Sequence, residues 1–180
     1  MNKQDIRAPL RQQRARLSTA QIQSNSAQVV QHIIESSLWQ QALKVAIYWP
    51  CQGEIDLTAL LTGSDKAIYL PAIQGQNMQF QRHHENLILH PHRYGMRQPA
   101  FIEGLTPAPL DLCLMPLLGF DEQGNRLGLG GGFYDRYFAD QPPTTLAGVA
   151  HAFQQVAQLP TDAWDVKLQH IFTEQGHHEF

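Results

Sequence analysis

Four apolar segments restrict the folds open to this chain more than any other feature of its sequence. They span residues 44–49, 67–70, 111–115 and 145–149, and few polar residues interrupt them. Apolar segments of this length that do not alternate with polar residues are typical of strands buried on both faces of a sheet. Helical patterns at 57–61 and 134–138 lie between them. The sequence therefore predicts an α/β fold, with a mainly parallel sheet covered by helices on both faces.

A single three-layer α/β/α domain is expected over residues 1–180, because this length is ordinary for one domain with its own core. Segment 78–82 alternates weakly and is predicted to be a peripheral strand or hairpin. Segment 91–109 is expected to be an irregular connection. Residues 176–180 are predicted to form a frayed tail, since chain ends are often poorly ordered.

Two helices are expected before the first strand. Ile6, Leu10 and Leu17 fall on one face of a helix over 2–17, where Pro9 either kinks the helix or marks its start. Ser18 then begins a capping-box pattern that predicts a second helix.

The N-terminal segment is basic and the rest of the chain is acidic. Residues 1–18 hold five basic residues and one acid, so they carry +4, and the other 162 residues carry −7 within the total of −3. The basic residues at 3, 7, 11 and 14 share one helix face. Such an arm is expected to attract an anion, whereas the acidic body argues against nucleic-acid binding.

The composition argues against several other classes of protein. No apolar run approaches the roughly 18 to 20 residues of a membrane helix, and the N-terminus lacks a secretory pattern, so we expect a cytoplasmic protein that does not enter membranes. Cys51 and Cys113 are too few for a disulfide framework and are expected to be reduced thiols. The nine histidines lack the spacing of a zinc site and are expected at the surface.

The most informative stretch is 115–136, which reads M-P-L-L-G-F-D-E-Q-G-N-R-L-G-L-G-G-G-F-Y-D-R. It leaves the end of a predicted strand, turns, passes four glycines within five positions and enters a predicted helix. Glycines let backbone N–H groups converge on phosphate oxygens, and the start of a helix adds partial positive charge. Arg126 before the glycines and Asp135 after them supply a cation for phosphate and a carboxylate for Mg²⁺.

Known phosphate motifs do not match this loop. It lacks the Gly-Lys-[Ser/Thr] of a Walker motif, and its third glycine falls one place early for G-x-G-x-x-G. A flexible glycine turn without a ligand is the alternative interpretation.

The pattern R-L-G-x-G-x-G-[FY]-Y-D-R, preceded by M-P and G-F-D-x-x-G, resembles the signature of the 5-formyltetrahydrofolate cyclo-ligases, also called methenyltetrahydrofolate synthetases. Further blocks resemble the same family in the same order over residues 3 to 174. They are K-Q-D-I-R at 3–7, E-I-D at 54–56, Y-G-M-R-Q-P at 94–99, L-P followed by Asp165, and I-F-T-E at 171–174. Two positions depart from the family pattern: Gly131 stands where many members have lysine, and Phe133 where tyrosine is commoner.

The resemblance implies a Rossmann-like fold, similar to that of sugar-phosphate isomerases and CoA transferases. It also implies a reaction in which ATP phosphorylates the formyl oxygen of 5-formyltetrahydrofolate, N10 attacks, and 5,10-methenyltetrahydrofolate forms with release of ADP and phosphate. The expected partners are therefore these two small molecules, with Mg²⁺ as cofactor and the protein acting as a monomer.

The resemblance also assigns roles to individual residues. Catalytic roles fall on Arg126 and Glu54. ATP-binding residues are expected to be Lys3, Arg7, Arg126, Gly128, Gly130, Gly131, Gly132, Phe133 and Tyr134. Substrate-binding residues are expected to be Trp49, Glu54, Tyr94 and Tyr134, and metal ligands Asp135 and Asp165.

Each role has a structural alternative. Arg11, Arg14 and Arg16 are expected to form a solvated basic face. Trp49 can equally be a core aromatic, and Asp135 and Asp165 can be helix-capping or surface acids.

Two rival functions stay open at this level. One is a different enzyme on a similar scaffold, such as a sugar-phosphate isomerase or a CoA transferase, which would use the glycine loop for a simple phosphate. The other is a non-catalytic nucleotide- or folate-binding module, which the missing loop lysine makes plausible.

Overall fold

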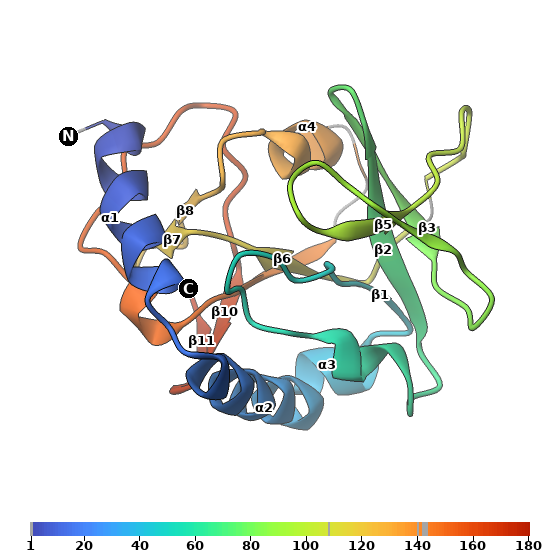
Figure 1. Ribbon diagram of the computed structural model, residues 1–180, viewed down its shortest axis with the longest axis horizontal. Coiled ribbons are helices and arrows are strands. Elements are labelled where there is room, and N and C mark those ends of the chain that lie inside the picture. The colour runs from blue at the N-terminus through green and yellow to red at the C-terminus, as the bar shows by residue number, and fades with distance from the viewer. Residues whose placement is uncertain (1, 108, 140, 142–143) are drawn as a thin grey trace.

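The computed structural model describes residues 2–107, 109–139, 141 and 144–180, and within them seven strands form one sheet (Figure 1). Its strand order is β11-β10-β9-β6-β1-β2-β3. The strands are β1 Lys44–Ala46, β2 Ala67–Gln74, β3 Asn77–Arg82, β6 Leu112–Pro116, β9 Thr145–Val149, β10 His170–Thr173 and β11 Gly176–Glu179. The five inner strands are parallel, whereas β3 and β11 pair antiparallel at the two edges. The predicted mainly parallel α/β sheet is confirmed.

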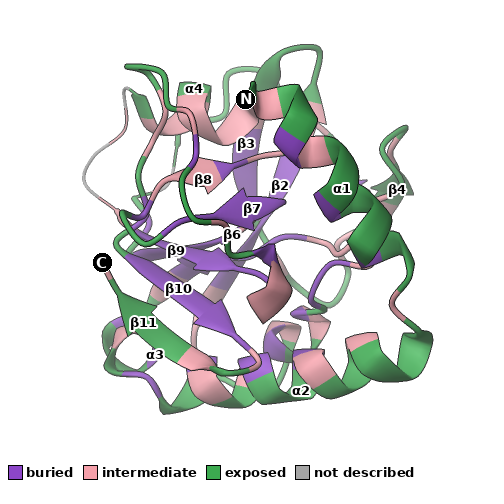
Figure 2. Cartoon of the chain, turned by 90° about the vertical axis from the view of Figure 1, so that its left-hand side faces the viewer, coloured by how far each residue is buried: buried purple, intermediate pink, exposed green. Residues whose placement is uncertain are grey.

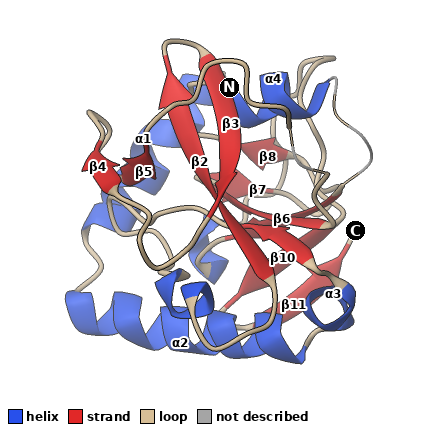
Figure 3. Ribbon diagram, turned by 90° about the vertical axis from the view of Figure 1, so that its right-hand side faces the viewer, coloured by secondary structure: helices blue, strands red, loops and turns tan. Residues whose placement is uncertain are grey.

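Helices lie on both faces of this sheet, as Figure 3 shows with α2 below and α4 above. The helices are α1 Lys3–Ala15, α2 Thr19–Glu35, α3 Ser37–Gln41 and α4 Phe133–Ala139, with 3₁₀ turns at Thr58–Leu61 and Ala152–Gln154. The segment predicted as helical at 57–61 is thus a 3₁₀ turn, and the one at 134–138 is α4.

The inner strands are mainly apolar because each face of the sheet has its own core. On β6, Leu112 and Leu114 pack into one cluster with Val29 and Ile33 of α2. The alternate residues of β6, such as Met115, pack into the other cluster with the aromatic residues of α4. A strand with helices on both sides has no face left for polar residues.

Two small hairpins lie outside the main sheet, near the carboxyl ends of its strands. Strands β4 (Leu89–Pro91) and β5 (Arg97–Pro99) form one of them, so part of 91–109 is regular rather than irregular. Strands β7 (Gly119–Phe120) and β8 (Arg126–Leu127) form the other. Helix α1 packs on this second hairpin through a third apolar cluster, which contains Ile6, Leu10, Leu118 and Leu127.

Two predictions about local structure need correction. Helix α1 begins at Lys3 with Asn2 as its N-cap, and Pro9 lies inside it. Residues 176–180 are not frayed: 176–179 form β11, and the Phe180 N–H donates to Gln169 O at 2.9 Å. Strand β11 was hard to foresee because it is an edge strand whose residues are mostly exposed, as its green colour in Figure 2 shows.

Candidate active site

The site lies at the carboxyl edge of the sheet, beside β1 and β6. Strand β1 pairs with β2 on one side and with β6 on the other. The chain therefore adds β2 on one side of β1 and later adds β6 on the opposite side. Loops that leave the carboxyl ends of two such strands diverge and open a crevice between them. The loop after β1 carries Trp49 and Glu54, and the loop after β6 leads to the glycines.

The glycine loop, residues 128–132, connects β8 to α4. Gly130 and Gly132 have φ angles of +109° and +64°, which residues with a Cβ rarely adopt. The glycines therefore hold a backbone path that other residues would resist. Helix α4 has seven residues, so its dipole adds less to anion binding than the sequence alone suggests.

Three arginines hold the carbonyl side of the glycine loop. The bonds run from Arg7 Nε to Gly128 O (3.0 Å), from Arg11 Nη2 to Leu129 O (2.8 Å) and from Arg136 Nη2 to Gly131 O (2.9 Å). Burial and the nearby Arg11 charge lower the pKa of Arg7. Two cations that repel one another beside this loop favour an anion between them. Arg11 is exposed, as predicted, but it also donates to a carbonyl of the glycine loop.

Gly131 and Phe133 are coupled in space. A Cβ added at Gly131 would lie 2.5 Å from the Phe133 ring, which is well inside van der Waals contact. The Arg136 guanidinium lies over the same ring, 5.1 Å from its centroid. The Phe133 ring thus fills the space of a residue-131 side chain, and a lysine there would require the ring to move.

Arg126 and Asp135 form a buried ion pair behind the glycine loop. Arg126 Nη2 lies 2.5 Å from Asp135 Oδ1, and the two side chains are 5% and 18% exposed. The Val166 N–H also donates to Asp135 Oδ1, at 3.0 Å. Arg126 Nε is buried and has no hydrogen-bond partner within the described part of the chain. An unpaired buried donor of this kind is costly unless a ligand accepts from it.

Lys3 and Asp165 form an ion pair with each other and do not line the cavity. Lys3 Nζ donates to Asp165 Oδ2 at 2.5 Å and to Asp162 Oδ2 at 2.7 Å. Burial lowers the pKa of Lys3, but the bonds to these two carboxylates raise it more. Lys3 is therefore a firm cation held at the edge of the site, and any contact with a ligand requires it to leave these carboxylates.

Glu54 is buried in the turn after β1. Its Oε2 accepts from the Cys51 N–H at 2.9 Å, whereas its Oε1 has no hydrogen-bond partner among the described residues. Burial raises the pKa of Glu54, and Arg14 and Cys51 act against that rise. One carboxylate oxygen is thus left for a donor from a ligand.

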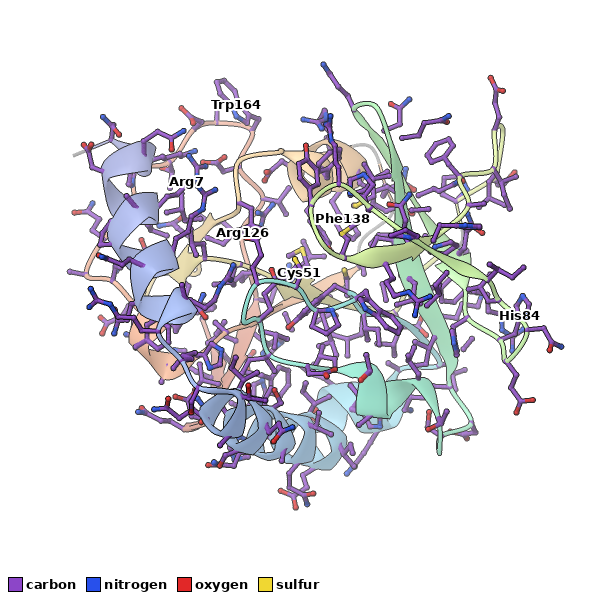
Figure 4. The ribbon with its side chains drawn as sticks, in the orientation of Figure 1. Arg7, Cys51, His84, Arg126, Phe138 and Trp164 are labelled. Carbon is purple, nitrogen blue, oxygen red and sulfur yellow. The ribbon has the colours of Figure 1, made fainter. Side chains whose placement is uncertain are left out.

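One cavity of about 460 Å³ joins these parts. Figure 4 shows Arg126 and Cys51, two of its lining residues, between α1 and the β2–β3 hairpin. Most of the residues predicted for the site line the cavity: Trp49, Glu54, Tyr94, Arg126, Gly128, Gly130, Gly131, Gly132, Phe133, Tyr134 and Asp135. Lys3, Arg7 and Asp165 do not, although Arg7 contacts the glycine loop.

A family model for the 5-formyltetrahydrofolate cyclo-ligase family matches residues 1–174. The chain belongs to this family. It is 34% identical over 176 residues to a 5-formyltetrahydrofolate cyclo-ligase of Haemophilus influenzae, covering 92% of this chain and 94% of that protein. It is 32% identical to one of Escherichia coli, covering 91% and 96%.

A solved structure agrees with this membership. The 5,10-methenyltetrahydrofolate synthetase of Aquifex aeolicus superposes with a TM-score of 0.84 at 31% identity, covering 99% of this chain and 93% of that one. The chain is therefore placed among the ligases of folate metabolism. The comparisons support the cyclo-ligase interpretation, and they do not support an isomerase, a CoA transferase or a non-catalytic module.

Asp135 and Asp165, the two carboxylates predicted to hold Mg²⁺, are both held by a cation of the chain, because Arg126 pairs with Asp135 and Lys3 with Asp165. Mg²⁺ commonly takes one or two carboxylates and fills its remaining positions with water and phosphate oxygens. Asp135 lines the cavity beside the glycine loop, whereas Asp165 is held by Lys3. Within the described residues, no three His, Cys, Asp or Glu side chains gather as a metal site.

The sequence interpretation of this cyclo-ligase missed two buried residues. Arg14 was expected in solvent but is 2% exposed, and His151 was not singled out although it is fully buried. Arg14 lies four residues after Leu10 and three before Leu17, so it sits on the apolar face of α1, and that spacing was a usable signal. His151 gave no comparable signal. In the described part of the chain, no helix is long and apolar enough to cross a membrane.

Proposed function

We propose that this chain closes the ring of 5-formyltetrahydrofolate to give 5,10-methenyltetrahydrofolate, with ATP as phosphoryl donor. The observation that carries the proposal is a cavity that joins the glycine loop to the Glu54 turn in a chain of the cyclo-ligase family. One end has backbone and guanidinium donors for phosphate, and the other has a carboxylate and aromatic rings for a pterin.

The nucleotide phosphates bind at the glycine loop in this proposal. The arginines that hold the loop carbonyls leave its N–H groups available to face the cavity, and Arg126 adds a buried guanidinium with an unpaired Nε. Buried cationic donors stabilise the charge of a phosphoryl group in transfer. Arg7 and Arg11 supply further positive charge from α1, which takes the place of a charge in the loop itself.

The folate binds at the other end. Glu54 Oε1, which is buried and has no hydrogen-bond partner among the described residues, accepts a hydrogen bond from the donor-rich edge of the pterin. Trp49 and Tyr94 line the same end of the cavity and offer ring faces to the pterin or aminobenzoate ring. Tyr134, at the start of α4, lies where it can contact either ligand.

The proposed reaction has two steps. The oxygen of the formyl group on N5 attacks the γ-phosphorus of ATP, and ADP leaves. The lone pair of N10 then attacks the formyl carbon, N10 loses its proton, and the carbon–oxygen bond breaks as phosphate departs. Neither step needs a covalent bond to the protein, so the enzyme acts by positioning both ligands and by stabilising phosphoryl charge.

Mg²⁺ is proposed to accompany the ATP and to offset charge on its phosphates. Asp135 would hold it from the protein side, because its carboxylate borders the glycine loop. Asp165 is a second ligand only if Lys3 turns to the phosphates and releases it. We also propose that the enzyme acts as a monomer in the cytoplasm.

Mixing the protein with Mg-ATP and 5-formyltetrahydrofolate tests the function directly. We expect near-ultraviolet absorbance of the methenyl product to rise, with one ADP formed for each product molecule. ATP hydrolysis without methenyl product, or no reaction with either compound, would refute the proposal. Tight folate binding without turnover would favour a binding module.

A further inference from the structure

The turn that carries Glu54 is held from behind by two buried residues outside the cavity lining. Arg14, on α1, is 2% exposed, and its Nη1 lies 3.9 Å from Glu54 Oε1. The same nitrogen donates to Leu117 O at 3.3 Å, which anchors the guanidinium to the segment after β6. Arg14 therefore links α1, the β6 loop and the Glu54 carboxylate.

The backbone of this turn is unusual. Gln52 and Gly53 both have positive φ angles, +50° and +77°, and a residue such as Gln52 adopts such an angle at a cost. A Cβ at Gly53 would lie 3.3 Å from Arg14 O and 3.4 Å from Arg14 Cγ. Helix α1 thus packs directly against the turn, and Arg14 occupies the space behind it.

His151, in the loop after β9, fixes the same turn from a third direction. Its Nε2 lies 2.9 Å from Gly53 O, and its Nδ1 lies 3.0 Å from Asn25 Nδ2. A carbonyl can only accept and an amide nitrogen can only donate, so the ring is neutral with its proton on Nε2. Burial lowers the pKa of His151, in agreement with a neutral ring.

We propose that Arg14 and His151 are positioning residues that hold the 52–54 turn so that Glu54 presents one oxygen, as a carboxylate, to the folate. This inference rests on the proposed function. Neither residue lines the cavity, so each acts through the turn or through Glu54 and not on the ligand. The strained backbone persists because three elements distant in sequence enclose it.

The charge on Glu54 depends on Arg14. The titratable groups around the carboxyl are Arg14 from α1, Tyr48 from the segment after β1, Cys51 from the turn and Tyr134 from α4. Of these, only Arg14 is positively charged. Burial raises the pKa of Glu54 and Arg14 lowers it, so without Arg14 the carboxyl takes up its proton at a higher pH.

The variants Arg14→Met and His151→Gln test the inference, with Arg16→Met as a matched control on an exposed arginine of the same segment. For Arg14→Met we expect the KM for 5-formyltetrahydrofolate to rise about tenfold or more, and the KM for ATP to stay within about twofold. The acid limb of activity should move to higher pH, because Arg14 no longer lowers the pKa of Glu54. Arg14→Lys should recover part of both effects.

Each result decides the question. An unmoved acid limb, or equal losses for ATP and folate, would mean that Arg14 only supports the fold. If Arg14→Met does not fold, Arg14→Lys and His151→Gln still give the KM ratio, and equal changes in the two KM values in both variants overturn the inference. Calorimetric titration with 5-formyltetrahydrofolate separates the two proposals: a wild-type protein that binds folate without turnover refutes the proposed function alone, and one that does not bind refutes both.

Discussion

Replacing Arg126 with methionine is the most informative change to this site. Methionine keeps much of the buried volume but removes the guanidinium, which pairs with Asp135 at 2.5 Å and is 5% exposed. At that distance and an effective dielectric constant of about 20, the attraction between the charges is about 7 kcal/mol. Because both groups also lose hydration on burial, we expect a net loss of about 3 to 5 kcal/mol when one partner is removed.

Two measurable effects follow for Arg126→Met. The melting temperature should fall by roughly 6 to 20 °C, since each kcal/mol corresponds to about 2 to 4 °C at this chain length. Well below that melting temperature, kcat/KM should fall by about 10²- to 10³-fold, because a buried donor to the phosphoryl group is lost. Differential scanning calorimetry and the methenyl absorbance assay measure these effects separately.

Two further variants isolate the causes. In Arg126→Met/Asp135→Asn the unpaired buried carboxylate is gone, so we expect the melting temperature to recover by at least half of the loss. Arg82→Met makes the same substitution at an exposed arginine of β3 and should leave both measurements unchanged. If folded Arg126→Met turned over within about threefold of wild type, the guanidinium would have no role in phosphoryl transfer.

Three other changes test separate parts of the structure. Asp135→Asn should raise the Mg²⁺ concentration for half-maximal activity on the order of tenfold, and an unchanged Mg²⁺ titration would remove Asp135 from the metal site. Truncation after Gln175 removes β11 and the His177 ring stacked on buried Phe172. The melting temperature should then fall by about 4 °C or more. An unchanged melting temperature would mean that the tail adds nothing to stability. Burial and the Glu54 charge raise the pKa of the Cys51 thiol to about 12. Iodoacetamide should therefore modify Cys51 slowly at pH 8 and faster in Glu54→Gln, as followed by mass spectrometry. Rapid alkylation of Cys51 in the wild type would contradict this environment.

The fold was largely predictable from the chain because its signals are local. Segments 111–115 and 145–149 are mainly apolar, and they coincide within one residue with β6 and β9, which are covered on both faces. Strand β11 was missed because its exposed residues 176–179 carry no apolar pattern. Its pairing with β10 comes from backbone hydrogen bonds and from contacts on one side only, which leave little trace in composition.

The candidate site likewise has a part that the sequence predicts and a part that it does not. The glycines and Asp135 stand within a few residues of Arg126, so one motif places them together, and they line one cavity. Arg14 and His151 lie far apart in sequence, and both reach the turn before Glu54. Their roles depend on three elements that approach one another only in the folded chain.

By itself, the sequence determined the parallel sheet, the glycine loop and the family, because each of these is recorded in short runs of neighbouring residues. Only the tertiary structure decided which arginines hold the loop, that Lys3 is bound by Asp162 and Asp165, and that Phe133 fills the space beside Gly131. Whether a charged side chain meets solvent, a carbonyl or a carboxylate depends on what the fold brings next to it, and spacing along one helix does not contain that information.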